Sequence, residues 1–314
     1  MAKYIRISCL GPKPYDIGSD SSNQNAVDKM IKHWEYEIEQ VLPDKPDIIV
    51  LPEVCDSPET YPLDLNHDYH RALGDSVLNL FSRIARENKC YIAYPSIRKV
   101  LDGSRRNSTR IIDRTGKVIG TYNKNHPVMN EITQAGILCG KEAPIIECSF
   151  GRVACVICFD LNFDELRSKY VREKPDLIIF SSMYHGGLMQ NYWAYSCKSY
   201  FAGAVAGLPC TIISPIGELI AISTNNFSYI TSTVNLDYVV VHPDENLERL
   251  KGIKKKYGPK VRVHDGGFLD AVLITSETDE ITAKEIIFEF GIELHEDYLA
   301  RSLTYHHNPE NMER

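Results

Sequence analysis

Short apolar runs rich in β-branched residues alternate along this sequence with longer segments of helical periodicity, and that alternation limits the possible folds more than any other feature. Predicted strands span residues 4–10, 47–51, 91–94, 153–158, 177–180 and 211–214. Between residues 25 and 41 the apolar side chains are mostly three or four positions apart, which is the spacing of one face of an amphipathic helix. A second such stripe runs from Leu73 through Val77 to Ile84.

Two further segments indicate antiparallel hairpins instead of strand-helix units. RIIDRTGKVIGTY has a turn at residues 114–116, and IISPIGELIAIS has one at residues 215–217. A chain that mixes hairpins with strand-helix units fits two sheets stacked face to face with helices outside. The sequence therefore predicts an α/β fold of the layered sandwich type.

Composition and charge exclude several classes of protein. The 43% hydrophobic and 25% charged residues are typical of a globular domain, and the net charge of -7 argues against a nucleic-acid partner. Residues 251–256 form a short basic run, which we interpret as the solvated end of a helix. No apolar stretch has the length of a signal peptide or of a transmembrane helix, so we expect a cytoplasmic protein without a membrane partner.

The nine cysteines occur mostly in apolar stretches, which predicts reduced and buried thiols. Cys155 and Cys158 form a C-x-x-C pair, but residues three apart on a strand point to opposite faces. Since no second pair completes a four-ligand site, we expect neither a metal nor a disulfide here.

Three residues of reactive type lie at or just past the ends of predicted strands: Glu53 in IIVLPEVCDSPE, Lys124 in GTYNKNHPVMNE and Cys158 in GRVACVICFDLNFDEL. The ends of parallel strands border the crevice in which α/β sheets usually bind ligands. The N–H groups of the turn that follows Cys158 can lower the pKa of its thiol and bind an oxyanion. Taken singly, Glu53 is also typical of a turn carboxylate, Lys124 of a surface lysine and Cys158 of a core cysteine.

The conjunction of the three segments resembles the nitrilase superfamily of carbon-nitrogen hydrolases. The matching motifs are LPE, Y-N-K-N-H and CFD-L-N-F-D-E, in the family's order, and the resemblance covers about residues 4–236. It implies a four-layer αββα sandwich, no cofactor, and assembly into homodimers or larger homo-oligomers. A second glutamate follows the lysine in that family, and Glu131 is at the matching position.

The resemblance also implies roles for these residues. Cys158 would be the nucleophile, Glu53 the base, and Lys124 the cation that stabilises the oxyanion together with the N–H of Phe159. The implied reaction is hydrolysis of a small linear amide through a thioester, with release of ammonia or an amine. An N-carbamoyl-amine hydrolase, a nitrilase, and a catalytically silent binding or assembly homologue remain alternatives.

Some positions depart from the family pattern. Asn162 stands where many members carry an arginine, which binds a substrate carboxylate in some of them, and residues 199–209 do not match the family's usual sequence. Tyr184 is at a position that lines the pocket in the family, although it is also typical of an ordinary loop. We expect residues 1–275 to form the hydrolase domain and residues 276–314 a C-terminal extension at a subunit interface.

Overall fold

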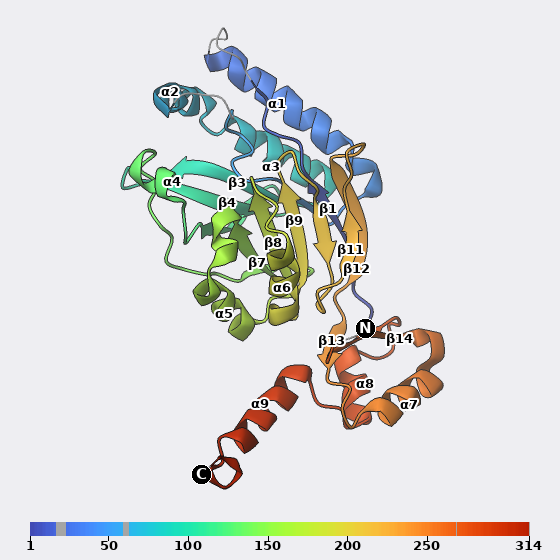
Figure 1. Ribbon diagram of the computed structural model, residues 1–314. Helices are drawn as coiled ribbons and strands as arrows, with labels where there is room; N and C mark the ends of the chain where they lie inside the picture. The colour runs from blue at the N-terminus through green and yellow to red at the C-terminus, as the bar shows by residue number, and fades with distance from the viewer. Residues whose placement is uncertain (17–22, 59–62, 268, 314) are drawn as a thin grey trace. The chain divides into compact units, whose positions relative to one another are not determined.

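The computed structural model describes residues 1–16, 23–58, 63–267 and 269–313 (Figure 1). It divides into two compact units. The larger comprises Ile5–Thr233, and the smaller combines Met1–Tyr4 with Val234–Arg314. No helix in the described part of the chain is long and apolar enough to cross a membrane.

Two six-stranded sheets form the framework of the larger unit. The first has the order β12 (Tyr229–Asn235), β1 (Tyr4–Leu10), β2 (Ile48–Val50), β3 (Tyr91–Lys99), β4 (Arg105–Ile112) and β5 (Val118–Asn123). The second has the order β11 (Leu219–Ile222), β10 (Thr211–Ile213), β9 (Tyr200–Val205), β8 (Leu177–Ser182), β7 (Gly151–Ile157) and β6 (Ile146–Cys148). β1, β2 and β3 are parallel, as are β7, β8 and β9, whereas β3–β4–β5 and β9–β10–β11 are antiparallel.

The two sheets pack face to face, since β2 contacts β8 and β9 and β4 contacts β7. Helices α1 (Asn23–Glu39), α2 (Leu63–Leu73) and α3 (Ser76–Asn88) pack together, and α3 covers β3 and β4. On the other side, α6 (Leu188–Cys197) covers β9 and β10 and contacts α5 (Asp164–Glu173) (Figure 1). The four layers confirm the predicted αββα sandwich.

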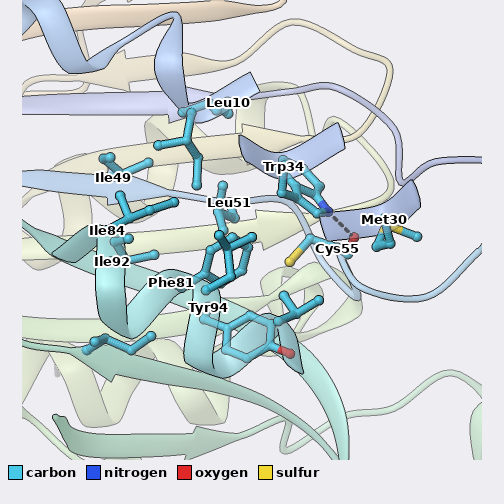
Figure 2. Close-up of a cluster of buried hydrophobic side chains, with 14 of the residues drawn as sticks. Leu10, Met30, Trp34, Ile49, Leu51, Cys55, Phe81, Ile84, Ile92 and Tyr94 are labelled. Carbon is cyan, nitrogen blue, oxygen red and sulfur yellow. Dashed lines mark hydrogen bonds between the residues drawn. The ribbon is translucent and has the colours of Figure 1, made fainter. Parts of the chain in front are cut away.

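The helix layer over the first sheet is held by a buried apolar cluster. Met30, Trp34 and Ile38 of α1 are fully buried, as the periodicity of this segment predicts. The Trp34 Nε1 donates a 2.6 Å hydrogen bond to the carbonyl oxygen of Cys55, which satisfies the one polar atom of this side chain (Figure 2). The loop after β2 is thereby fixed to α1.

The predicted helical stripe is confirmed from Val77 to Ile84, which lies buried on α3, but Leu73 belongs to the preceding helix. Gly74 has φ +48 and separates Leu73, the last residue of α2, from α3, which begins at Ser76. Because a left-handed backbone ends a right-handed helix, the stripe continues across two helices.

Both predicted hairpins are confirmed. The turn between β4 and β5 is closed by Asp113, whose Oδ1 accepts from the N–H groups of Thr115 and Lys117 at 2.8 and 3.0 Å. Gly116 with φ +82 and Gly217 with φ +80 take the left-handed positions of the two turns.

The unusual segment at residues 199–209 contains β9, a buried strand of the second sheet that runs parallel to β8. Steric crowding explains why residue 203 is a glycine. A Cβ atom at this position would lie 2.6 Å from Gln190 Oε1 and 2.9 Å from Thr211 Oγ1. The small side chains of this strand therefore allow α6 and β10 to pack closely against it.

The smaller unit has a three-stranded antiparallel sheet of its own. Its strands are β13 (Tyr238–Val241), β15 (Val272–Ser276) and β14 (Val261–Asp265), and its helices are α7 (Leu247–Tyr257), α8 (Ala283–Glu289) and α9 (His295–His306). Short 3₁₀ turns occur at η3 (Gly258–Lys260) and η4 (Pro309–Asn311). The basic run at residues 251–256 does end a helix, as expected, and Lys251 Nζ pairs with Glu248 Oε1 at 2.6 Å. Residues 276–313 lie in this unit, and their role at a subunit interface stays a prediction.

Candidate active site

Glu53 lies in the loop that follows β2 and is 4% exposed. Its Oε1 accepts hydrogen bonds from Lys124 Nζ at 2.7 Å and from Asn107 Nδ2 at 2.8 Å. A buried carboxylate needs such partners, because burial of an unpaired charge is costly. The loop after β2 thus holds the Glu53 carboxyl group beside Lys124 in the interior of the larger unit.

Lys124 directly follows β5 and is 1% exposed. In addition to Glu53, its Nζ bonds to Glu131 Oε2 at 2.7 Å. Burial lowers the pKa of Lys124, but the carboxylates of Glu53 and Glu131 raise it above its ordinary value. The side chain is therefore a fixed cation throughout the range of pH in which proteins work.

Cys158 directly follows β7 and begins the 3₁₀ turn η2 (Cys158–Asn162). Its φ of +48 is left-handed, which is uncommon for a residue other than glycine and typical of strained functional positions. The Glu53 carboxylate, the Lys124 ammonium and the Ser182 hydroxyl lie close enough to shift the pKa of the thiol. The three residues at the ends of predicted strands therefore meet at one place.

The protonation state of Cys158 corrects one expectation. Instead of lowering the pKa of the thiol, its surroundings raise it to about 12, first through burial and then through the negative charge of Glu53, which outweighs Lys124. The resting sulfur is a neutral thiol beside a carboxylate, and it needs a base in order to attack.

Asn107 completes the group and was missed by the sequence analysis. It lies on β4, is 1% exposed, and its Nδ2 donates to Glu53 Oε1 and to Glu131 Oε1, both at 2.8 Å. The backbone carbonyl oxygen of Asn107 accepts a hydrogen bond from the backbone N–H of Lys124 at 2.8 Å. A signal existed in the two-residue alternation of RRNSTRII, which puts Asn107 on the inward face with the buried Ile111.

Glu131 is on the short helix α4 (Met129–Thr133), where its Oε2 also accepts from the Val128 N–H at 2.8 Å. This bond fixes the carboxylate at the start of the helix while it pairs with Lys124. The structure thus brings Glu131 into the group, at the position expected for a supporting carboxylate.

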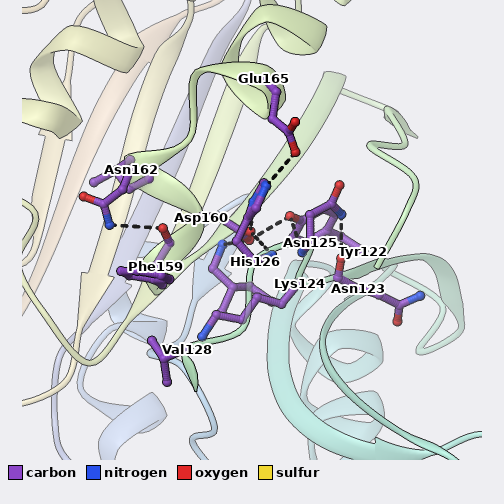
Figure 3. Close-up of polar contacts among 12 residues, drawn as sticks. Tyr122, Asn123, Lys124, Asn125, His126, Val128, Phe159, Asp160, Asn162 and Glu165 are labelled. Atoms are coloured by element: carbon purple, nitrogen blue, oxygen red, sulfur yellow. Dashed lines mark hydrogen bonds and ion pairs between the residues drawn. The ribbon is translucent and has the colours of Figure 1, made fainter. Parts of the chain in front are cut away.

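Asp160 is a second residue that the sequence analysis missed. It is fully buried, and its Oδ2 accepts from the Tyr122 hydroxyl at 2.7 Å and from the Ile157 N–H at 3.1 Å (Figure 3). Its Oδ1 accepts from the His126 N–H at 2.8 Å. Asp160 thereby joins the turn that bears Cys158 to the segment that bears Lys124.

Phe159, Asn162 and Tyr184 lie at the outer side of this turn. Asn162 Nδ2 donates to the Phe159 carbonyl oxygen at 3.1 Å (Figure 3). It also donates to the Tyr184 hydroxyl at 3.2 Å. The Tyr184 N–H donates to Ser182 Oγ at 3.0 Å, and Ser182 in turn lies near the thiol. Tyr184 is thus connected to the cysteine, and a role for any of the three in binding substrate stays a prediction.

The sequence was compared with known proteins. The model of the carbon-nitrogen hydrolase family matches residues 17–241, which is most of the chain. The chain belongs to the carbon-nitrogen hydrolase family. Among curated relatives, the omega-amidase NIT2 of Xenopus tropicalis is 24% identical over 243 residues, covering 70% of this chain and 85% of the relative.

Solved structures of other carbon-nitrogen hydrolases show the same fold. Nit3 of Saccharomyces cerevisiae, from the nitrilase superfamily, superposes with a TM-score of 0.60 at 16% identity, covering 82% of this chain and 95% of Nit3. A mutant amidase from Nesterenkonia sp. AN1 gives a TM-score of 0.59 at 15% identity, covering 74% and 89% of the two chains. In that amidase the acetamide moiety of fluoroacetamide is covalently added at the active-site cysteine.

All nine cysteines of this carbon-nitrogen hydrolase are free thiols, and they differ in access. Six are buried, among them Cys55 and Cys197, whereas Cys139 is exposed. Among the described residues, no group of three or more His, Cys, Asp or Glu side chains could hold a metal ion.

The raised pKa of Cys158 predicts how alkylation depends on pH. In a Cys139→Ser background, iodoacetamide should modify Cys158 faster than the six buried cysteines, because those thiols are less accessible. Since the thiolate is the reactive form and the pKa is about 12, the rate should still rise above pH 9 without a plateau. Peptide mapping by mass spectrometry measures this. A plateau near neutral pH, or faster labelling of Cys55 or Cys197, would contradict the assignment.

Proposed function

We propose that this protein is an amidase that cleaves the C–N bond of a small linear amide through a thioester on Cys158. The observation that carries the proposal is the ion pair of Glu53 with Lys124 at 2.7 Å, placed close enough to Cys158 for both charges to act on its thiol. A nucleophile, a base and a cation within hydrogen-bonding reach make up the set of groups that acyl transfer requires. The omega-amidase relatives support the choice of an amide.

In the first half of the reaction, the Glu53 carboxylate takes the proton of the Cys158 thiol as the sulfur attacks the amide carbonyl carbon. The carbonyl oxygen becomes an anion, which Lys124 Nζ and the Phe159 N–H stabilise. Protonated Glu53 then gives its proton to the departing nitrogen. Ammonia or an amine leaves, and the acyl group remains on sulfur as a thioester.

In the second half, a water molecule replaces the departed amine. Glu53 takes a proton from the water as its oxygen attacks the thioester carbonyl carbon, and the same two donors stabilise the second oxyanion. The intermediate collapses with cleavage of the C–S bond, and the proton on Glu53 returns to sulfur. The products are a carboxylic acid and the free thiol of Cys158.

The neutral surroundings of Asn162 bear on the charge of the substrate. Its amide contacts only the Phe159 carbonyl and the Tyr184 hydroxyl and offers no bidentate charged fork of the kind that arginine provides for a carboxylate. We therefore propose that the substrate is neutral or cationic at the end that meets Asn162.

A panel of amides, carbamoyl compounds and nitriles, assayed by ammonia release, tests the activity and the substrate class together. Linear amides should be hydrolysed with the highest kcat/KM. Between an N-carbamoyl amino acid and its decarboxylated analogue, the analogue should be preferred, because charge-assisted bonds to the carboxylate are absent at Asn162. Preference for the carboxylate would contradict the interpretation of Asn162, whereas nitrile hydrolysis alone would contradict the amidase proposal. No turnover of any compound would favour a binding homologue.

A further inference from the structure

Antiparallel pairing of β3 with β4 gathers arginines that are separated in the sequence. Arg98 lies directly opposite Arg106, Ser96 opposite Ser108, and Tyr94 opposite Arg110. Directly opposed residues share a face of the sheet, and Tyr94 belongs to the buried cluster that contains Trp34 of α1 and Phe81 of α3. The arginines are thus on the helix-bearing face, opposite to the face on which Asn107 meets Glu53.

Two of the guanidinium groups lean toward each other over the buried serine pair. Arg98 Nε donates to Ser108 Oγ on the neighbouring strand at 3.0 Å, and Arg110 Nη2 donates to Ser96 Oγ at 2.8 Å. Arg106 is at the rim, where its Nη1 donates to Ser104 Oγ at 2.8 Å. The three side chains are partly buried, and the acceptors of these bonds are neutral.

The positive charges of this cluster are only partly compensated. Burial and the charges of Arg110 and Arg106 lower the pKa of Arg98. Arg110 lies over the Tyr94 ring, with its Cζ 4.4 Å from the ring centroid. Within the described chain none of the three forms an ion pair, and Arg110 Nε is a buried donor without a partner. Burial raises the pKa of Asp56 to about 6 although the nearby Arg110 lowers it, so at neutral pH this carboxylate is mostly ionised and offsets one of the three positive charges.

We propose that the helix-bearing face of β3 and β4 binds a phosphate group, held by Arg98 and Arg110 over the Ser96–Ser108 pair with Arg106 at the rim. Guanidinium groups match the geometry of phosphate oxygens, and a dianion compensates several cations better than a single carboxylate does. This site is separate from the proposed amidase centre and does not depend on it. The ligand class is inorganic phosphate or the phosphate group of a small monoester.

Calorimetric titration and thermal unfolding of the full chain test the proposal. Inorganic phosphate and glycerol phosphate are titrated in turn at neutral pH, with ionic strength held constant by chloride. We expect saturable binding and a rise in Tm, since a ligand that binds only the folded state stabilises it. Tighter binding of glycerol phosphate would identify a monoester as the ligand, and tighter binding of inorganic phosphate would identify the free ion.

Variants separate a specific site from the general effect of phosphate on proteins. Arg98→Gln and Arg106→Gln should each weaken binding by about 10- to 100-fold, the loss of one charged hydrogen-bonding group. Lys254→Gln removes one charge from α7 in the smaller unit and should leave the affinity unchanged. An equal, non-saturating rise in Tm for all four proteins would reflect exclusion of phosphate from the protein surface and would overturn the proposal. Absence of binding to the wild-type chain would overturn it as well.

Discussion

Replacement of Cys158 by alanine is expected to lower kcat for ammonia release by about 10⁴-fold or more, because no other group in the site can form the thioester. The thiol lies near Glu53 and Ser182 but is not part of a large apolar cluster, so the fold should persist. The measurement uses the best amide of the panel, with steady-state ammonia release for the rate and circular dichroism for the fold.

A matched control removes a different thiol. Cys139→Ala deletes the exposed cysteine and should leave kcat unchanged. Intact-protein mass spectrometry provides an independent readout, since wild-type protein quenched in acid during turnover should carry the acyl adduct, and Cys158→Ala should show none. Activity of Cys158→Ala within tenfold of wild type, or an adduct on another residue, would exclude Cys158 as the nucleophile.

Replacement of Lys124 by methionine is expected to affect both rate and stability. Loss of the oxyanion-stabilising cation should lower kcat by about 10²- to 10³-fold. The same change leaves the carboxylates of Glu53 and Glu131 buried without their cation, which should cost about 3–5 kcal/mol of unfolding free energy. Denaturant unfolding, together with ammonia release, measures the two effects on the same preparation.

The loss of unfolding free energy in Lys124→Met should depend on pH. The folded-state pKa of Lys124 is raised above its ordinary 10.5, so its contribution to stability is fully present below pH 10.5 and is lost only as pH rises through the folded value. In Lys124→Met the unpaired carboxylates should take up protons more easily. The stability deficit should therefore shrink as pH falls.

Two further variants distinguish catalysis from packing. Lys117→Met removes an exposed lysine of the β4–β5 turn and should change neither rate nor stability. The double variant Lys124→Met, Glu131→Gln should regain part of the lost stability but none of the activity, because one unpaired carboxylate is gone and the oxyanion donor is still missing. Recovery of activity in the double variant would contradict the role of Lys124.

Local patterns in the sequence were sufficient for most of the framework and for the reactive residues. The period-two and helical runs predicted the strands and the layered fold, because burial of one face imposes its period on the sequence. Glu53, Lys124 and Cys158 could be found because each directly follows such a strand and lies in a motif of the family. The strand β9 could not, since its close packing against α6 and β10 depends on other elements. The break at Gly74 was not predicted either, although this glycine, with φ +48 and open space around it, is a local signal.

The chemical state of the site was decided by the tertiary structure alone. Asn107 and Asp160 acquire their roles from partners on other strands, and the arginines of β3 and β4 form a cluster only through cross-strand pairing. The same holds for Cys158, whose position at a strand end suggested an easily ionised thiol. Burial and the charge of Glu53 make it a neutral one, because a pKa depends on the charges and solvent around a group, which the sequence brings together only when the chain is folded.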